Sequence, residues 1–367
     1  MTVPPAAIAW FVSPHGFGHA ARAGAVMEAI FDLDASVRFE VFTTIPAWFF
    51  QETLNSDFGY HVLETDIGFV QKTPFEADVK ETFQALDRFL PFPEDRLQAL
   101  ARQVRDLTCR LVVCDISALG IRVAQTAQLP SVLVENFTWD WIYRNYDDPS
   151  PILGTCAGYL NQYYQSVDHH IQTEPICHRQ PAVLTVDPAS RKIRNPRAVT
   201  RRQLEVEAEQ IMVLITTGGV PKDRPPMDAL KQFQSIQFVV PGLTETVRED
   251  NVLCLNNTSS FYHPDLVAAA DAVIGKAGYS TIAEVFHAGV PFGYVSRPEF
   301  PESKVLAGFI ETEMTGIPID RRTFHSGAWE TELRRLLRMP RRWPGASNGA
   351  VQIAKYILNL IQQSKEI

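Results

Sequence analysis

The feature that most constrains the fold is a repeated alternation between short apolar runs and longer segments with helical spacing. The apolar runs lie at 7–13, 37–43, 111–115 and 131–135 in the first half, and at 211–216, 236–240, 252–255, 272–275 and 291–295 in the second. Between them, apolar residues recur every three to four positions, as in an amphipathic helix. Strands that alternate with such helices form a parallel sheet covered on both faces. The sequence therefore predicts an α/β fold with two Rossmann-like domains.

The length of 367 residues agrees with two domains, because a domain usually has about 100–200 residues. We expect an N-terminal domain at 1–190, a C-terminal domain at 191–345, and a last helix at 346–367 that crosses back to the first domain. The boundary segment near 185–209 is rich in proline and basic residues, namely Pro188, Arg191, Lys192, Arg194, Pro196, Arg197, Arg201 and Arg202. We interpret it either as a solvated linker or as a basic patch for an anionic acceptor or a membrane surface.

The composition argues against several classes of protein. The formal net charge is −8, so the chain has no overall positive field for nucleic acid. No run reaches the roughly 18–20 apolar residues that a membrane-spanning helix needs, and residues 1–9 lack the basic residues of a signal peptide. The five cysteines show no metal-ligand spacing, which is typical of reduced thiols in a cytoplasmic protein.

A turn with two histidines and two glycines follows the first strand. His15, Gly16, Gly18 and His19 lie where this strand meets the first helix, and Arg22 follows within that helix. Glycines allow a tight turn, and a helix N-terminus offers unpaired N–H groups to an anionic ligand. The glycines also fit a loose dinucleotide-binding pattern, but no acidic residue ends the second strand to hold a ribose, which disfavours a nicotinamide cofactor. We expect His19 to act as a general base for the hydroxyl of an acceptor substrate and His15 to lie near that acceptor. The alternative is that either histidine only packs under the turn.

Asp115 ends the strand at 111–115. Ligands of parallel α/β sheets gather at the carboxyl ends of strands, so Asp115 and His19 are expected at the same edge. A carboxylate beside an imidazole fixes its tautomer and stabilises its protonated form, which predicts a catalytic dyad. The alternative is that Asp115 caps the helix predicted at 116–128.

Two glycine-containing turns in the second half predict a phosphate site. Gly218 and Gly219 follow the strand at 211–216 and could form a backbone nest for a diphosphate. The more specific turn spans 275–284 and contains Lys276, Gly278, Ser280, Thr281 and Glu284 at a strand–helix junction. The serine, threonine and lysine are expected at the diphosphate, and Glu284 could accept both hydroxyls of a ribose. The alternative for Thr281 and Glu284 is a capping box.

Two further segments follow strand ends. Asn136, Trp139 and Asp140 combine an aromatic face with amide and carboxylate groups, as carbohydrate sites often do, and could line an acceptor pocket. The alternative is that the aromatic residues pack in the core. Glu299 and Glu302 follow the strand at 291–295 and could bind hydroxyls of a donor sugar, or else lie in a solvated loop.

These motifs together resemble the N-terminal glycosyltransferase-like region of plant L-arabinokinase and its stand-alone bacterial relatives. The matching segments are His15-Gly16-Phe17-Gly18-His19-Ala20, Asn136-Phe137, Pro264-Asp265-Leu266, Gly275-Lys276 with Gly278-Tyr279, Thr281 and Glu284, and Asn348-Gly349. The resemblance covers essentially the whole chain and does not extend to the sugar-kinase domain of that family, so we expect no kinase activity.

The chain is more broadly similar to glycosyltransferase-B enzymes, including the N-acetylglucosaminyltransferase of peptidoglycan synthesis. This resemblance implies two Rossmann-like domains facing across a cleft, a nucleotide-sugar donor on the C-terminal domain, and no catalytic metal or cofactor. It implies Glu284 at the ribose, Gly218, Gly219, Ser280 and Thr281 at the diphosphate, and His19 near the acceptor. The glutamine pair that reads the donor sugar in the peptidoglycan enzyme is absent, which leaves the sugar open.

The sequence therefore predicts a metal-independent, inverting hexosyl- or pentosyltransferase, with a UDP-sugar favoured as donor and an unknown small-molecule, glycan or lipid-linked acceptor. The Asp32-Leu33-Asp34 segment is not expected to bind a metal, because it lies far from the other motifs. The alternatives are a nucleotide-sugar epimerase of the same architecture and a non-catalytic nucleotide-sugar-binding module.

Overall fold

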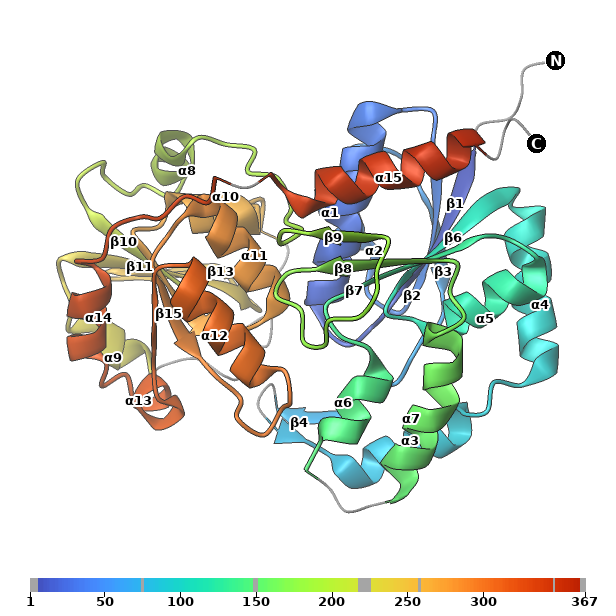
Figure 1. Cartoon of the computed structure of the whole chain (residues 1–367). Coiled ribbons are helices and arrows are strands. Elements are labelled where there is room, and N and C mark those ends of the chain that lie inside the picture. Colours follow the sequence, from blue (N-terminus) through green and yellow to red (C-terminus); the bar gives the residue numbers. More distant parts are fainter. Residues whose placement is uncertain are drawn as a thin grey trace.

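The computed structural model describes residues 6–73, 76–147, 151–216, 226–256, 259–345 and 347–363. Within them the chain forms two α/β units side by side, each with a mainly parallel sheet between helices (Figure 1). The predicted fold class of two Rossmann-like domains is confirmed. Among the described helices, none is long and apolar enough to cross a membrane.

The sheet of the N-terminal domain has the strand order β3-β2-β1-β6-β7-β8-β9, with every neighbouring pair parallel. Its strands are β1 (Ala7–Val12), β2 (Arg38–Thr43), β3 (Gly59–Val62), β6 (Cys109–Asp115), β7 (Ser131–Glu135), β8 (His169–Thr173) and β9 (Leu184–Val186). The central strands read as continuous apolar runs because helices bury both faces. A separate two-stranded antiparallel sheet consists of β4 (Gln71–Thr73) and β5 (Glu76–Ala77).

Helices cover this sheet in two layers. One layer is α1 (Phe17–Leu33), α2 (Ala47–Thr53) and α15 (Gly349–Gln363), and the other is α3 (Val79–Phe89), α4 (Glu94–Asp106), α5 (Ala118–Ala127) and α7 (Pro151–Tyr164). The short helix α6 (Trp139–Asn145) packs beside α7. The first layer packs on β1 through side chains such as Val26 and Met27, and the second packs on the opposite face through Leu97, Leu119 and Leu160.

The C-terminal domain repeats this design. Its sheet has the order β12-β13-β11-β10-β14-β15-β16, and only β12 runs antiparallel to its neighbour. The strands are β10 (Ile211–Thr216), β11 (Ile236–Leu243), β12 (Val247–Glu249), β13 (Val252–Asn256), β14 (Ala272–Lys276), β15 (Phe292–Val295) and β16 (Gly316–Pro318). The helices are α8 (Arg197–Gln203), α9 (Met227–Lys231), α10 (His263–Ala269), α11 (Tyr279–Ala288), α12 (Ser303–Glu313), α13 (Arg321–Ser326) and α14 (Glu330–Leu336).

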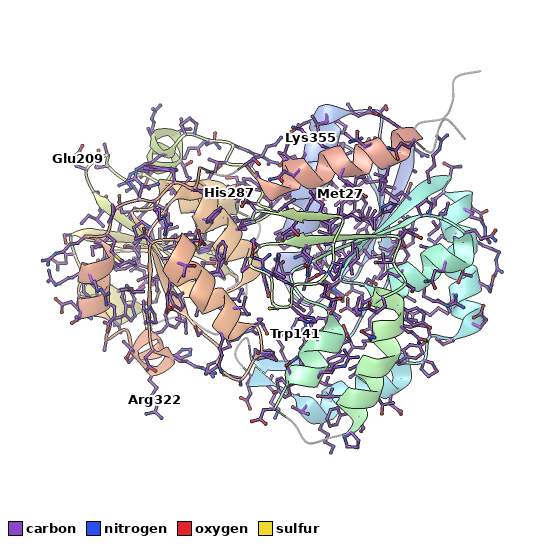
Figure 2. The ribbon with its side chains drawn as sticks, in the orientation of Figure 1. Met27, Trp141, Glu209, His287, Arg322 and Lys355 are labelled. Atoms are coloured by element: carbon purple, nitrogen blue, oxygen red, sulfur yellow. The ribbon has the colours of Figure 1, made fainter. Side chains whose placement is uncertain are left out.

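The last helix, α15, returns to the N-terminal domain and lies along α1 (Figure 1). Its apolar residues Ile353, Ile357 and Ile361 are buried in the same core as Met27 of α1. Lys355 of α15 points outward on the opposite side (Figure 2). The amphipathic pattern of α15 therefore joins the chain's end to its beginning.

Two predicted elements differ in the structure. The helical spacing of residues 323–338 predicts a single helix, but the structure has two helices there, α13 and α14, because Gly327 has a φ of 73° and ends the first of them. The helix predicted at 116–128 begins two residues later, as α5. Its N-cap is Ser117, whose hydroxyl accepts a hydrogen bond from the Gly120 amide at 3.2 Å. The expectation that Asp115 caps this helix is wrong.

Candidate active site

A cavity of about 170 Å³ lies between the two domains, at the carboxyl edges of both sheets. Its N-terminal wall comes from the turn after β1, the start of α1 and the segment after β7, including His15, Gly16, Gly18, His19, Arg22, Asn136 and Trp139. Its C-terminal wall comes from the ends of β14 and β15 and the start of α11, including Lys276, Gly278, Ser280, Thr281, Arg297 and Glu302. Most of the predicted site residues thus meet in one cavity, as expected for ligand sites of parallel sheets.

Two uncapped helix N-termini face each other across this cavity. The N-cap residues of α1 and α11 are Gly16 and Gly278, and neither helix has a side-chain cap or an acidic residue in its first turn. A Cβ atom added to Gly18 would lie 3.7 Å from Oγ of Ser280, so the two first turns nearly touch. Gly16 has a φ of 89°, a conformation that favours glycine. The unpaired N–H groups and positive ends of two helix dipoles therefore converge, which favours an anion.

His19 and Asp115 form a buried pair, although 96 positions separate them in sequence. Nδ1 of His19 donates to Oδ1 of Asp115 at 2.7 Å, and Arg22 donates to both carboxylate oxygens at 2.6 and 2.8 Å. An ionised carboxylate only accepts, so Nδ1 carries the proton and the neutral imidazole has its lone pair on Nε2. His19 is 7% exposed and Asp115 is 1% exposed. This geometry suits a general base held by a carboxylate.

The charges around this pair keep Asp115 ionised. Burial alone would raise the pKa of Asp115, but the Arg22 guanidinium and the His19 hydrogen bond hold its pKa below the ordinary value. Arg22 also donates to the side-chain oxygen of Asn136, whose amide in turn donates to Oγ1 of Thr173 at 2.8 Å. Asn136 therefore fixes Arg22, and Arg22 fixes the carboxylate.

The remaining residues that were predicted on the acceptor side are divided between cavity and core. Trp139 and Phe137 line the cavity and are also buried in the apolar cluster behind it, so their packing in the core does not exclude a place in the cavity wall. His15 packs edge-on against Trp139, with ring centroids 4.9 Å apart. Burial lowers the pKa of His15 well below its usual value, and His19, Arg297 and Lys276 lower it further. Asp140 lies outside the cavity lining and pairs with Arg144 at 2.7 Å.

In the C-terminal wall of the cavity, Arg297 and Glu302 form an ion pair at 2.8 Å. The guanidinium of Arg297 also lies 4.0 Å from the ring centre of Phe300. Glu302 is 5% exposed, and its Oε2 has no hydrogen-bond partner in the described part of the chain. A buried carboxylate oxygen without a donor is costly, which is expected where a ligand hydroxyl supplies the donor. Glu299 instead pairs with Arg321 at 3.4 Å, away from the cavity.

Glu284 lines a second cavity of about 110 Å³ on the far side of the α11 N-terminus. Its Oε1 accepts from Arg191 at 2.9 and 3.0 Å, and its Oε2 accepts from Nδ1 of His263 at 2.6 Å. Burial would raise the pKa of Glu284, but Arg191 and His263 lower it to about 2. The capping-box alternative is wrong, because the N-cap position of α11 is Gly278 and not Thr281, and the Glu284 carboxylate accepts from Arg191 and His263.

The basic segment at the domain boundary is neither a solvated linker nor a free patch. Arg191 pairs with Glu284, Arg194 with Glu28, and Arg197 and Arg201 with Asp271. Lys192 pairs with Asp32, so this aspartate of the Asp32-Leu33-Asp34 segment serves an ion pair. The arginines therefore hold the segment between the domains against both of them.

Sequence reasoning missed His263 and Asp66, and it named Arg191 only as part of the basic boundary segment, without its contact to Glu284. Asp66 is a buried carboxyl that accepts from the Ser13 hydroxyl at 2.9 Å, directly behind the turn that carries His15. Burial raises its pKa to about 8. Nothing in the local sequence marks Asp66, since it lies in a loop without periodic pattern.

The predicted phosphate residues Gly218 and Gly219 lie outside the described residues.

Comparison with known proteins gives one informative sequence relative. No model of a protein family matches the chain. The chain is 27% identical to L-arabinokinase of Arabidopsis thaliana over 365 residues. The alignment covers 95% of this chain and 34% of L-arabinokinase, so the chain spans about a third of that protein, in its N-terminal part.

Solved structures of glycosyltransferases resemble the whole chain. UGT89C1 of Arabidopsis thaliana in complex with UDP superimposes with a TM-score of 0.60 at 12% identity, over 96% of this chain and 94% of that one. SnogD of Streptomyces nogalater superimposes with a TM-score of 0.56 at 17% identity, over 95% of this chain and 92% of that one. MurG of Acinetobacter baumannii superimposes with a TM-score of 0.55 at 15% identity, over 98% of this chain and 100% of that one. The chain therefore has the glycosyltransferase-B fold.

Proposed function

We propose that the protein is a metal-independent, inverting glycosyltransferase that moves a sugar from a nucleotide-sugar, with UDP-sugars favoured, to an acceptor hydroxyl. The observation that carries this proposal is the convergence of two uncapped helix N-termini beside a buried imidazole–carboxylate pair. The first is a site for a diphosphate, and the second is a site for removing a proton from a hydroxyl. The likeness to UDP-bound UGT89C1 supports this class of donor.

In this proposal, Nε2 of His19 takes the proton of the acceptor hydroxyl. The acceptor oxygen then attacks the anomeric carbon, and the bond from that carbon to the diphosphate oxygen breaks. The electron pair leaves with the nucleoside diphosphate, and the proton passes from His19 to solvent. Asp115 stabilises the imidazolium that forms in between, because its own charge is held by Arg22.

The leaving diphosphate would be stabilised where its charge develops. The first turns of α1 and α11 offer backbone N–H groups, and Lys276 adds a positive charge in the same cavity. Glu302 would accept from a hydroxyl of the donor sugar through the oxygen that lacks a partner within the described residues. Trp139, His15 and Asn136 would form the acceptor side.

The test is release of nucleoside diphosphate from a panel of nucleotide-sugars in the presence of a pool of hydroxyl acceptors. We expect one donor to be turned over by the wild type. His19→Ala should reduce that rate by about 100-fold or more, since a general base accelerates a reaction by about 10²–10⁴-fold. The affinity for the nucleotide should stay unchanged.

Two outcomes would contradict the proposal. Conversion of the donor sugar to an isomer without any acceptor would indicate an epimerase. Tight binding of a nucleotide-sugar with no turnover of any donor, and with the same affinity in His19→Ala, would indicate a non-catalytic binding module.

A further inference from the structure

A buried carboxyl that the proposed mechanism does not use lies behind the cavity between the two domains. Asp66 is 7% exposed and does not itself line this cavity. Its Oδ1 accepts from the hydroxyl of Ser13 at 2.9 Å, and Oγ of Ser13 accepts from the backbone N–H of His15 at 3.3 Å. His15 does line the cavity. Two hydrogen bonds in series therefore connect the buried carboxyl to the cavity wall.

Asp66 also lies near Trp139, the residue against which His15 packs edge-on. The side chains of Asp66 and Trp139 line the same void of about 10 Å³. Within the described residues, neither Oδ2 of Asp66 nor Nε1 of Trp139 has a hydrogen-bond partner. A buried acceptor and a buried donor without partners are both costly, so an interaction between these two groups is favoured. The carboxyl is thus connected to the wall through a second residue.

The loop that carries Asp66 is held against the same wall. The hydroxyl of Thr65 donates to the carbonyl of Val12 at 2.8 Å, which fixes the loop to the end of β1. Gly68 has a φ of 58°, and a Cβ atom added there would lie 2.6 Å from Nδ1 of His15. The backbone of the loop therefore packs directly on the imidazole, and only glycine fits at this position. The carboxyl between these two contacts has little freedom to move.

The groups around Asp66 favour its neutral form. Burial and the nearby carboxylates of Asp115 and Glu64 raise its pKa to about 8, and the hydroxyl and indole donors act against this rise. Tyr143 of α6 and Tyr164 of α7 also face the carboxyl. Burial raises the pKa of both phenols well above the usual value, so both stay neutral. At pH 7 the compartment behind the wall therefore holds an uncharged acid.

We propose that Asp66 is a positioning residue for the acceptor, because it holds His15 and Trp139 in the cavity wall through Ser13 and through the indole. This inference rests on the proposed function, which supplies the acceptor. Ionisation of Asp66 brings a charge into a closed compartment, and a buried charge has to be hydrated or paired. The wall then loosens and the acceptor binds more weakly at high pH, whereas binding of the nucleotide does not change.

The competing explanation is that Asp66 only stabilises the fold. Asp66→Asn separates the two explanations, because an amide still accepts from Ser13 but cannot ionise. Asp66→Ala removes the connection at every pH. Glu40→Ala is the matched control for lost stability, since Glu40 is also 7% exposed and bonds to Nε2 of His61 at 2.8 Å, away from the cavity.

The first measurement is the indole N–H resonance of Trp139 in ¹H–¹⁵N correlation spectra of the full chain between pH 6 and pH 10. The chain has 6 tryptophans, and the spectrum of Trp139→Phe assigns the resonance. We expect the resonance of the wild type to move with a midpoint near pH 8, the pKa of Asp66, and to stay in place in Asp66→Asn. A resonance that does not move in the wild type, or that moves equally in Asp66→Asn, would overturn the inference.

The second measurement is the KM for the acceptor that supports nucleoside diphosphate release, at pH 7 and pH 9. About a tenth of the molecules keep the neutral acid one pH unit above a pKa of 8, so the KM of the wild type should rise by about 10-fold. Asp66→Asn should have one KM at both pH values. Asp66→Ala should raise the KM by about 5-fold or more at both, as for one lost hydrogen bond. Glu40→Ala should behave as the wild type does.

The affinity for nucleoside diphosphate should be the same in all of these variants. An acceptor KM of the wild type that is equal at pH 7 and pH 9, or an equal rise in Asp66→Asn, would overturn the positioning role and leave the proposed function intact. If Asp66→Ala does not fold, the comparison of Asp66→Asn with the wild type decides alone. Absence of turnover with every donor would overturn the proposed function, and the resonance of Trp139 would still show whether Asp66 controls this wall.

Discussion

Asp115→Asn is the substitution that most sharply probes the buried pair. The change keeps the shape of the side chain and removes its charge. In the wild type the carboxylate accepts one hydrogen bond from His19 and two from Arg22, at 2.6–2.8 Å. An amide has one oxygen and one NH₂ group, so one of these donors must face another donor.

The magnitude follows from burial. Arg22 is 6% exposed and would be left opposite a neutral amide, and breaking a buried ion pair in this way destabilises a protein by about 3–5 kcal/mol. The turnover should fall on the order of 10³–10⁴-fold, as in other imidazole–carboxylate pairs, because the amide no longer fixes the tautomer or stabilises the imidazolium. Nucleotide affinity should not change, since Asp115 does not line either cavity.

The assays are urea unfolding, nucleoside diphosphate release and calorimetric binding at pH 7. Asp140→Asn is the stability control. Asp140 is also a buried carboxylate, but its partner Arg144 is 45% exposed, so we expect a loss of only about 1 kcal/mol. A loss of under about 1 kcal/mol for Asp115→Asn, or turnover within tenfold of the wild type, would refute the reasoning.

Three further predictions concern the strand–helix junction, the buried acid and metals. Gly275→Ala should unfold the C-terminal domain or destabilise it by more than about 3 kcal/mol in urea titrations, because the new Cβ would lie 1.9 Å from the Thr216 carbonyl oxygen. Gly278→Ala is the control: its Cβ would meet no atom within 4 Å, so the substitution should be tolerated. The pKa of Asp66 is raised from 3.8 to about 8, so the contribution of this carboxyl to stability is present below pH 3.8 and is lost as the pH rises through 8. Asp66→Asn should therefore melt at a higher temperature than the wild type, and the difference in Tm should grow between pH 5 and pH 9. A difference in Tm that stays constant over this range would contradict the prediction. Chelation of divalent cations should leave nucleoside diphosphate release unchanged, and a stimulation of more than about tenfold by Mg²⁺ or Mn²⁺ would contradict a metal-independent reaction.

The elements that carry the site could be predicted from local sequence. The bounds of β10 agree with the strand predicted at 211–216, and α11 begins at the predicted strand–helix junction, because an apolar β-branched run and a glycine turn before a periodic segment are local signals. The helices and strands at 139–186 were not predicted, since their short apolar stretches lack a clear period. The break at Gly327 was also missed, because a glycine that adopts positive φ looks like any other glycine in sequence.

Only one general rule of parallel sheets allowed distant residues of the candidate site to be placed together from the sequence. The carboxyl ends of parallel strands share one edge, and this rule brought His19 and Asp115 together across 96 positions. No such rule connects Arg191 to Glu284 or Asp66 to Ser13, because these contacts depend on how a linker and a loop pack in three dimensions. The same limit explains why the boundary arginines were interpreted as a solvated linker or a basic patch and not as ion-pair partners of the two domains.

The most direct test of the account is calorimetric titration of the wild type and Glu284→Ala with UDP, GDP, dTDP and ADP. We expect one nucleoside diphosphate to bind the wild type, and we expect the substitution to abolish that binding, because the carboxylate lines the cavity beside α11. A ligand at about 100 times its Kd should also stabilise the wild type by about 2.7 kcal/mol. If no nucleotide binds, or if Glu284→Ala binds one as the wild type does, the donor site does not lie at α11 and the account is contradicted.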